Sequence, residues 1–153
     1  MATFNFKKLE TKLEKELKAL ATAKEVNVGF LSGATYSDGT PVAEVAALNE
    51  YGREVKSKQG NYYQLPRPFF RNCIAKNSKS WGEGLGRLLV KEKYDARKAL
   101  SYLGFQASGD LVQEIQEFTT PPLAESTVKA KGFPKPLIDT GHMINSIDFE
   151  VKE

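Results

Sequence analysis

The sequence predicts an α+β fold in which a small antiparallel β-sheet packs against several α-helices. Three observations support this prediction. The 153 residues are enough for one hydrophobic core and few for two. Apolar residues recur at helical spacing over most of the chain, whereas two short segments near its opposite ends alternate apolar and polar residues. No internal repeat or low-complexity linker divides the chain, so residues 1–153 are expected to form a single domain.

Residues 4–24 are expected to form an amphipathic N-terminal helix. Lys and Glu occupy most of its faces, and the apolar residues recur at spacings of three and four: Phe6, Leu9, Leu13, Leu17 and Leu20. The next segment, 26–31, alternates with a period of two and is rich in β-forming residues, which predicts a strand. The leucine side of the helix is narrow, and it also suits packing on a neighbouring subunit.

A second helix is predicted at 41–51, after a turn rich in Gly, Ser, Thr and Asp at 32–40. Pro41 presets the first helical turn, and Gly52 is a suitable C-cap. The following residues, 53–65, are polar and charged and lack the apolar periodicity of a buried face. They are expected to form an exposed loop or a projecting hairpin.

Two long helices are predicted at about 68–91 and 94–118, where apolar residues again recur at helical spacing. Pro68 is a suitable first helical residue, and the short connection favours an antiparallel pair. Three glycines lie within 82–86, and each costs about 1 kcal/mol in a helix interior. We therefore expect the first long helix to bend, break or pack closely against another backbone there.

The C-terminal part is predicted to contain a short helix at 123–131 and a single helical turn at 141–145. Asp139, with Thr140, is expected to cap that turn. Replacing Asp139 by Ala should then lower the stability of the protein by about 1 kcal/mol. Residues 146–152 alternate apolar and polar residues, which predicts a final strand that pairs with the first one.

Composition excludes several kinds of site. A net charge of +3, from 22 Lys plus Arg against 19 Asp plus Glu, is too small to indicate a nucleic-acid partner by itself. The single Cys73 excludes an internal disulfide and a multi-cysteine metal site, and the single His142 excludes a histidine cluster. The sequence has no apolar stretch of membrane-spanning length and no signal-like start. We expect no metal, no cofactor and no membrane partner.

Motifs that look catalytic are short or poorly placed. Residues 138–141 resemble the Asp-Thr-Gly signature of aspartic proteases, but only twelve residues follow them, too few for the strands of that fold. A small hydrolase built on Asp139 is therefore the third hypothesis. The glycine-rich segment 82–86 follows no predicted strand, unlike a nucleotide-binding loop. Cys73 falls on or beside the apolar side of its helix, which disfavours a nucleophile pair with His142. We expect no enzyme, no catalytic residue and no small-molecule substrate.

A nucleic-acid-binding accessory protein is the second hypothesis. The segment 53–71 interleaves basic and aromatic residues that suit phosphate contact and base stacking: Lys56, Lys58, Arg67, Arg71, Tyr62, Tyr63, Phe69 and Phe70. A hydrophobic core and a solvated loop explain the same residues more simply, because Phe70 also belongs to the apolar side of a helix and Glu54 lies near the lysines.

Three segments taken together resemble the tail-completion and neck proteins of tailed bacteriophages. They are VAALNEYG at 45–52, LPRPFFR at 65–71 and PLIDTG at 136–141, the last followed by INSI at 144–147. They span about two thirds of the chain, and their combination is more specific than any one of them. The residues that match the family pattern are expected to act mainly as fold determinants: Asn49, Tyr51, Gly52, Arg67, Pro68, Asp139, Thr140 and Gly141.

The resemblance implies a virion structural protein at the head-to-tail junction, made in the host bacterial cytoplasm. It implies a homo-oligomeric ring, for example a hexamer, that joins the tail to the head connector. Its expected partners are a connector or adaptor, a tail terminator or the tail tube, with non-specific contact to DNA left open. A closed ring needs two different patches that meet head to tail. We expect one on the first helix and one on the loop that follows the second: Phe6, Leu9 and Leu13, with Lys56, Lys58, Tyr62 and Tyr63.

Overall fold

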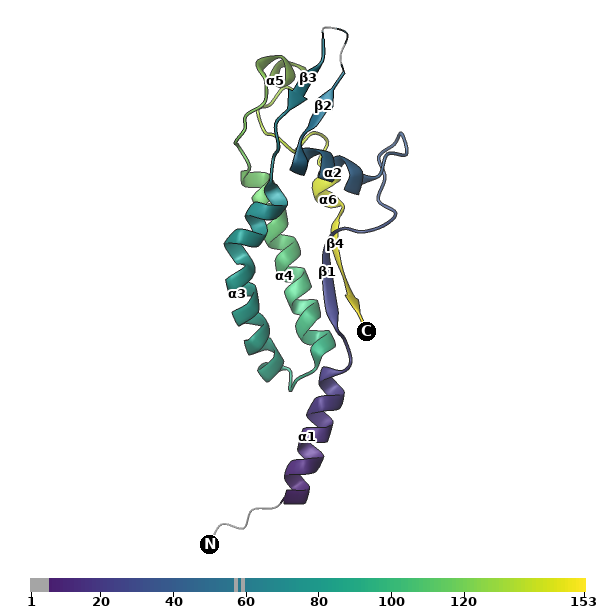
Figure 1. Ribbon diagram of the computed structural model, residues 1–153, viewed down its shortest axis with the longest axis vertical. Coiled ribbons are helices and arrows are strands. Elements are labelled where there is room, and N and C mark those ends of the chain that lie inside the picture. The colour runs from purple at the N-terminus through teal and green to yellow at the C-terminus, as the bar shows by residue number, and fades with distance from the viewer. Residues whose placement is uncertain (1–5, 57, 59) are drawn as a thin grey trace.

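The computed structural model describes residues 6–56, 58 and 60–153, and it confirms the α+β class (Figure 1). Helices and strands alternate irregularly along the described residues. Their order and bounds are α1 (Phe6–Leu20), β1 (Glu25–Phe30), α2 (Val42–Tyr51), β2 (Arg53–Val55), β3 (Tyr62–Gln64), α3 (Phe69–Lys91), α4 (Ala96–Glu117), α5 (Glu125–Lys131), α6 (His142–Asn145) and β4 (Ile147–Lys152). The predicted helix at 4–24 is thus shorter at its C-terminal end, and its first two positions lie outside the described residues.

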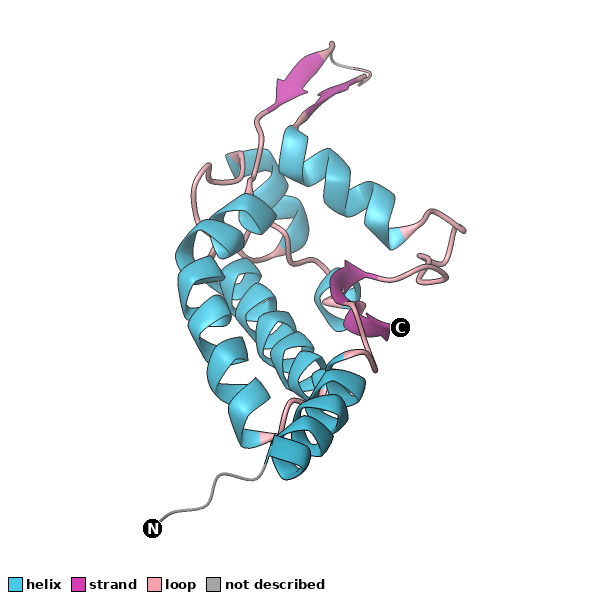
Figure 2. Cartoon of the chain, turned by 60° about the horizontal axis from the view of Figure 1, so that its bottom comes forward, coloured by secondary structure: helices cyan, strands magenta, loops and turns pink. Residues whose placement is uncertain are grey.

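The strands form two separate two-stranded sheets. β1 pairs antiparallel with β4, from Glu25 opposite Lys152 to Phe30 opposite Ile147, as the alternation at both ends of the chain predicts. β2 and β3 form the predicted hairpin, with Arg53 opposite Gln64. The hairpin forms a sheet of its own and does not join β1 and β4. Both views show the β2–β3 hairpin projecting from the end of the molecule opposite to α1 (Figures 1 and 2).

α4 lies between α3 and the β1–β4 sheet (Figure 1). α3 and α4 run antiparallel, as predicted, and Trp81 on α3 donates a hydrogen bond of 2.7 Å from Nε1 to Asp110 on α4. Lys76 on α3 pairs with Glu114 on α4, whose side chain is nearly buried. Gly104 marks a close approach of α4 to the sheet, because a Cβ built there would lie 2.4 Å from the ring of Phe149.

The hydrophobic core forms where the start of α3 meets α2, the last turns of α4 and α6. Phe69 lies at its centre and is fully buried, and Cys73 one turn later is 1% exposed. Burial also raises the pKa of the Cys73 thiol. The remaining core residues are Val42, Ala46, Leu111, Ile115, Phe118 and Met143.

The glycines at 82–86 neither break α3 nor bring another backbone close to it, so two of the three predicted consequences were wrong. α3 runs unbroken from Phe69 to Lys91 through Gly82, Gly84 and Gly86. A Cβ at any of the three would meet no other atom within 4 Å, so no backbone approaches them closely. Packing of the opposite side of α3 against α4 holds the helix together despite its low local propensity.

Replacing Gly86 by Ala is expected to raise the free energy of unfolding by about 0.5–1 kcal/mol. The substitution adds helix propensity, removes conformational freedom from the unfolded chain and meets open space in the folded one. Urea denaturation followed by far-ultraviolet circular dichroism measures the change. A loss of stability would show that the glycine is required by its surroundings.

Candidate functional site

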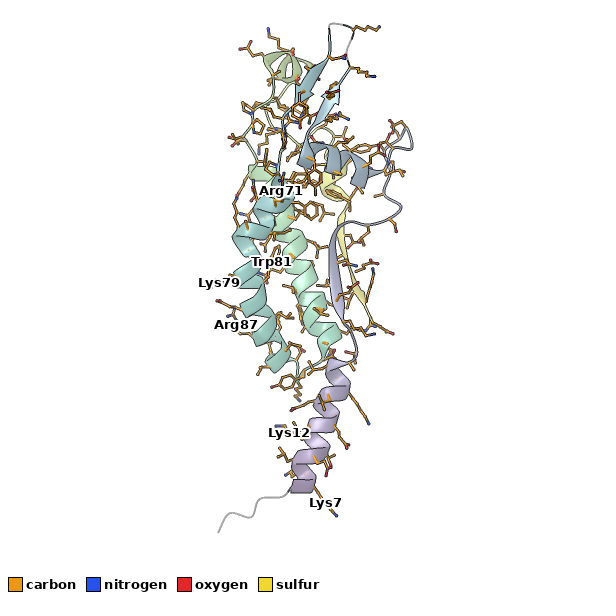
Figure 3. The ribbon with its side chains drawn as sticks, in the orientation of Figure 1. Lys7, Lys12, Arg71, Lys79, Trp81 and Arg87 are labelled. Carbon is orange, nitrogen blue, oxygen red and sulfur yellow. The ribbon has the colours of Figure 1, made fainter. Side chains whose placement is uncertain are left out.

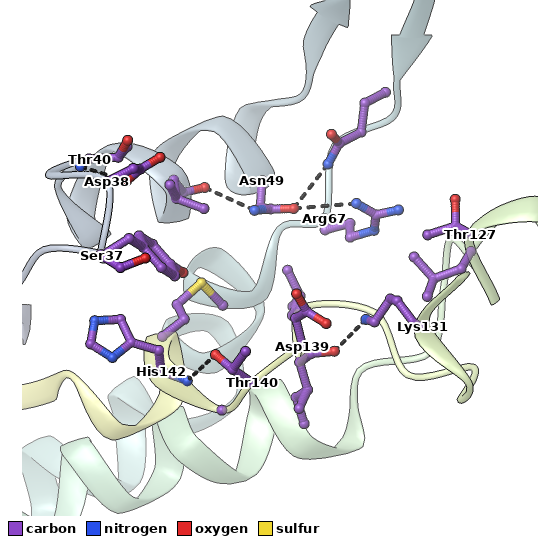
Figure 4. Close-up of a pocket in the computed structure, with 18 of the residues that line it drawn as sticks. Ser37, Asp38, Thr40, Asn49, Arg67, Thr127, Lys131, Asp139, Thr140 and His142 are labelled. Carbon is purple, nitrogen blue, oxygen red and sulfur yellow. Dashed lines mark hydrogen bonds between the residues drawn. The ribbon is translucent and has the colours of Figure 1, made fainter. Parts of the chain in front are cut away.

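Residues from all three family-like segments line one cavity of about 640 Å³ (Figure 4). α2 contributes Asn49, the segment before α3 contributes Arg67, and the turn before α6 contributes Asp139, Thr140 and Gly141. Positions separated by up to 92 residues in the sequence therefore meet at a single site. This convergence makes the cavity the first candidate for a functional site.

Asn49 connects the elements on one side of this cavity. Its Nδ2 donates to the backbone oxygen of Val45 at 2.9 Å, and its Oδ1 accepts from Gln64 Nε2 at 2.9 Å. The same Oδ1 accepts from Arg67 Nη1 at 3.3 Å, and the backbone oxygen of Asn49 accepts from Arg67 N at 2.7 Å. One amide side chain thus fixes the last turns of α2, strand β3 and the approach to α3.

Arg67 is the most unusual charged group in the cavity. Its Nε is buried and has no hydrogen-bond partner among the described residues. Burial lowers the pKa of the Arg67 guanidinium, and the charge of Tyr62 acts in the opposite direction. Lys131 on α5 lies on the same cavity, and burial lowers the pKa of its ammonium as well, with Arg67 adding to the effect and Asp139 opposing it.

The expected cap at Asp139 was wrong. α6 has no side-chain cap from its N-cap residue, Gly141, and the amide of His142 donates instead to Thr140 Oγ1 at 3.3 Å. Asp139 is exposed, and its side chain makes no hydrogen bond within the described part of the chain. Gly141 has a φ of 80°, so the turn favours glycine for a backbone reason.

The other motif residues lie outside this cavity. Tyr51 is exposed and stacks under the guanidinium of Arg71, whose carbon is 5.5 Å from the ring centre. Gly52 ends α2 with a φ of 77°, and a Cβ there would lie 2.6 Å from the backbone oxygen of Gln64. Pro68 directly precedes α3. These three residues lie where α2 ends and where α3 begins, and they do not line the cavity.

Glu50, which is 5% exposed, was not among the site residues predicted from the sequence. Its Oε2 accepts from the backbone N–H of Phe70 at 2.9 Å, and its Oε1 accepts from Arg71 N at 3.3 Å and Arg71 Nε at 2.8 Å. Glu50 therefore caps α3 from another helix, while Pro68 at the N-cap offers no side-chain acceptor. The sequence signal that could have indicated this role is an acidic residue on the buried side of a short helix.

The predicted interface on α1 is exposed along its leucine side. Leu9, Leu13, Leu17 and Leu20 are between 38% and 64% exposed. α1 extends away from the rest of the molecule, and Lys7 and Lys12 project from it (Figures 1 and 3). The side chain of Phe6, the remaining residue of this set, lies outside the described residues.

The structure separates the residues of the expected nucleic-acid surface. Lys56, Lys58, Tyr62 and Tyr63 are exposed on the hairpin. Phe69 lies in the core with Phe70 packed against it, Arg67 faces the cavity and Arg71 pairs with Glu50. The hairpin part of the segment thus keeps its basic and aromatic residues exposed, whereas Arg71, although its side chain is 58% exposed, is paired with Glu50.

A second cavity of about 300 Å³ forms an apolar groove between β1 and α3, with α4 as its floor. β1 contributes Val26 and Val28, α3 contributes Ile74 and Trp81, and α4 contributes Leu103. Ile74 is half exposed at this groove. Its residues come from three elements and each is apolar for reasons of packing, so no local pattern in the sequence predicts the groove.

Comparisons with known proteins add no relative: no family model, curated protein or solved structure matches the chain. Among the described residues, no helix is long and apolar enough to cross a membrane. The same residues contain no group of three or more His, Cys, Asp or Glu side chains placed to hold a metal ion.

Proposed function

We propose that the protein is a bacteriophage virion structural protein of the head-to-tail junction, a tail-completion or neck protein that acts as a ring subunit. The observation that carries this proposal is α1, an amphipathic helix that extends from the body with its leucine side uncovered. The resemblance of the three segments supports it, since their residues meet around one cavity. In the virion the ring would join the tail to the head connector.

α1 needs a partner on physical grounds. It has 15 residues, and isolated helices of about 12–15 residues are marginal in water. Complete burial of an exposed leucine gains about 1.5–3 kcal/mol, so these leucines, which are 38–64% exposed, would gain roughly half of that each. The described body contacts α1 through α4, and just after the helix Thr22 Oγ1 accepts from Arg97 N at 3.2 Å. A second copy that covers the leucines would supply the missing stabilisation.

The apolar groove between β1 and α3 is a suitable receiving face for that helix. The two patches are different, so the contact is heterologous and forms a ring when its rotation closes. The hairpin, which was our expected second patch, then remains available for a neighbouring phage protein. Its exposed Tyr62 and Tyr63 are residue types that are enriched at protein interfaces.

The double variant Leu13→Asp/Leu17→Asp is expected to convert the ring into a monomer, because each buried carboxylate would be unpaired in the interface. Native mass spectrometry at matched concentrations measures the mass. Lys15→Asp is the control, since it adds the same residue to the exposed polar face of α1. An unchanged ring in the double variant would contradict the proposal.

Ile74→Asp tests the groove in the same assay, and it is expected to give a monomer too. A mixture of this variant with the α1 double variant keeps one intact contact, so it should form a heterodimer and no ring. Restored rings, or no association at all, would contradict a head-to-tail contact between α1 and the groove. Neighbouring terminase, portal and tail-tube genes would support the phage assignment independently.

A nucleic-acid-binding accessory protein remains the alternative, and the exposed hairpin with Lys56, Lys58, Tyr62 and Tyr63 favours it. In this case DNA affinity would fall steeply with salt. Replacing both lysines by Ala would reduce that slope. A DNA affinity that does not depend on salt, or that is too weak to measure, would contradict the nucleic-acid-binding alternative.

A further inference from the structure

We propose that the 640 Å³ cavity binds an acidic segment of a protein partner, with one carboxylate in contact with Nη2 of the Arg67 guanidinium. The carboxylate site follows from the geometry alone. That the segment belongs to a protein rests on the proposed function, in which this chain meets other virion proteins.

The guanidinium of Arg67 makes few hydrogen bonds within the described residues. Nη1 donates to Asn49, Nε is buried without a partner, and Nη2 has no hydrogen bond and is not buried as Nε is. Because Nε has almost no accessible surface, a ligand in the cavity reaches the guanidinium through Nη2. A carboxylate oxygen placed there would accept a charge-assisted hydrogen bond from a partly desolvated group.

Lys131 places a second positive charge on the same cavity. Its Nζ donates to the backbone oxygens of Lys135, at 2.9 Å, and Ile138, and it lies 4.7 Å from the ring centre of Phe133. Figure 4 shows Lys131 beside Asp139, across the cavity from Arg67. Neither cation forms an ion pair with a carboxylate of the described chain.

Two nearly buried carboxylates, unlike these cations, form direct ion pairs within the described chain. Glu50 pairs with Arg71, and Glu114 pairs with Lys76. The chain thus pairs these charges directly, whereas Arg67 and Lys131 form no direct ion pair within the described residues and Asp139 attracts Lys131 only at longer range. A carboxylate from a partner could form the direct contact that the two cations lack.

The composition of the cavity favours a carboxylate over a phosphate. Asp38 and Asp139 also line it, and they would repel the greater negative charge of a phosphate more strongly than one carboxylate. Leu123 and Leu137 add apolar surface beside the charges. The volume lies in the range of about 300–1,000 Å³ typical of ligand sites, so apolar residues next to the acidic one also fit.

The test uses the full chain labelled with ¹⁵N, with the arginine Nε–H signals followed by NMR. The probe is the peptide acetyl-Leu-Glu-Leu-Glu-Leu-amide, and its control has Gln in place of both Glu. We expect the Arg67 Nε–H signal to move with the first peptide and to stay with the second. Equal shifts with both peptides, or no shift with the acidic one, would overturn the proposal.

Two variants locate the site by isothermal titration calorimetry. Arg67→Gln should weaken binding of the acidic peptide about tenfold or more, the loss expected for one charged hydrogen-bonded contact. Arg87→Gln, on the outer face of α3, should leave the affinity unchanged (Figure 3). Lys131→Gln should weaken binding about threefold, and it decides the matter if the Arg67 variant does not fold.

Two further probes test the chemistry of the occupant. Inorganic phosphate and an oligothymidylate should both bind more weakly than the peptide, and tighter binding of either one would overturn the choice of a carboxylate. Because the titration is independent of the mass of the assembly, peptide binding by a chain that forms no ring would count against the proposed function alone. A ring that ignores the peptide would count against the cavity alone.

Discussion

Replacing Glu50 by Ala is expected to lower the free energy of unfolding by about 2–4 kcal/mol. The Glu50 side chain is 6% exposed, and its carboxylate accepts from two backbone N–H groups at the start of α3 as well as from Arg71. Loss of a helix cap costs about 0.5–2 kcal/mol, and loss of a charged hydrogen bond adds about 1.5–3 kcal/mol. We place the sum below the simple total because the contributions share one carboxylate.

The position of the cap makes this effect large. α3 begins at Phe69, in the centre of the core, so its first turn cannot fray without exposing that side chain. The carboxylate also lies at the positive end of the helix dipole, which it stabilises. Glu50 therefore couples α2 to the start of α3, and its loss should loosen both.

Arg71→Gln is the matched control, because it removes the ion pair and leaves the cap in place. The Arg71 side chain is 58% exposed, so solvent screening limits its contribution to about 1 kcal/mol or less. Urea denaturation of both variants separates the two roles. Equal losses would assign the stability to the ion pair and contradict the cap.

Local patterns in the sequence predicted the elements of this fold well. The period of two at β1 and β4 and the helical spacing in α3 and α4 reflect side chains that face one neighbour, and the structure confirms all four. The caps were not predictable in this way. Glu50 caps a helix 19 residues further along the chain, whereas the local candidate Asp139 is exposed. A cap supplied by another element leaves no signature at the helix it serves.

The cavity was only partly predictable. The family resemblance indicated Asn49, Arg67 and Asp139, but it did not indicate that they face one space. Lys131 was missed because it stands among other lysines on a short polar helix, where a solvated side chain is the ordinary expectation. Only the fold brings it opposite Arg67. The exposed side of α1 was predicted as an interface, whereas the groove depends on three elements and required the structure.

Gly104→Val is expected to destabilise the protein by about 3 kcal/mol. Gly104 is buried on α4 where that helix crosses the β1–β4 sheet. A Cβ there would lie 2.4 Å from Phe149 Cδ2 on β4 and 2.9 Å from Val26 Cγ2 on β1. Neither contact is possible between real atoms, so the sheet must move away from α4 or side chains must leave their rotamers.

Gly84→Val is the matched control on the other long helix, because a Cβ at Gly84 meets nothing within 4 Å. That substitution should change stability by about 0.5 kcal/mol at most, since valine is a slightly better helix former than glycine. Thermal and urea denaturation of the two variants should therefore give very different results for the same chemical change. Similar stabilities would show that α4 does not need a glycine where it meets the sheet.

A double-mutant cycle with Phe149→Ala identifies the contact responsible. Removing the ring opens space beside position 104, so the double variant should lose less stability than the sum of the two single variants. Additive losses would place the strain elsewhere, at Val26 or in the helix itself. Because Phe149 lies on the last strand, a positive result would also show that α4 holds the C-terminal strand by close packing at one glycine. The β1–β4 sheet, and with it the groove that β1 borders, then depends on a residue for which the helical pattern of α4 gives no signal.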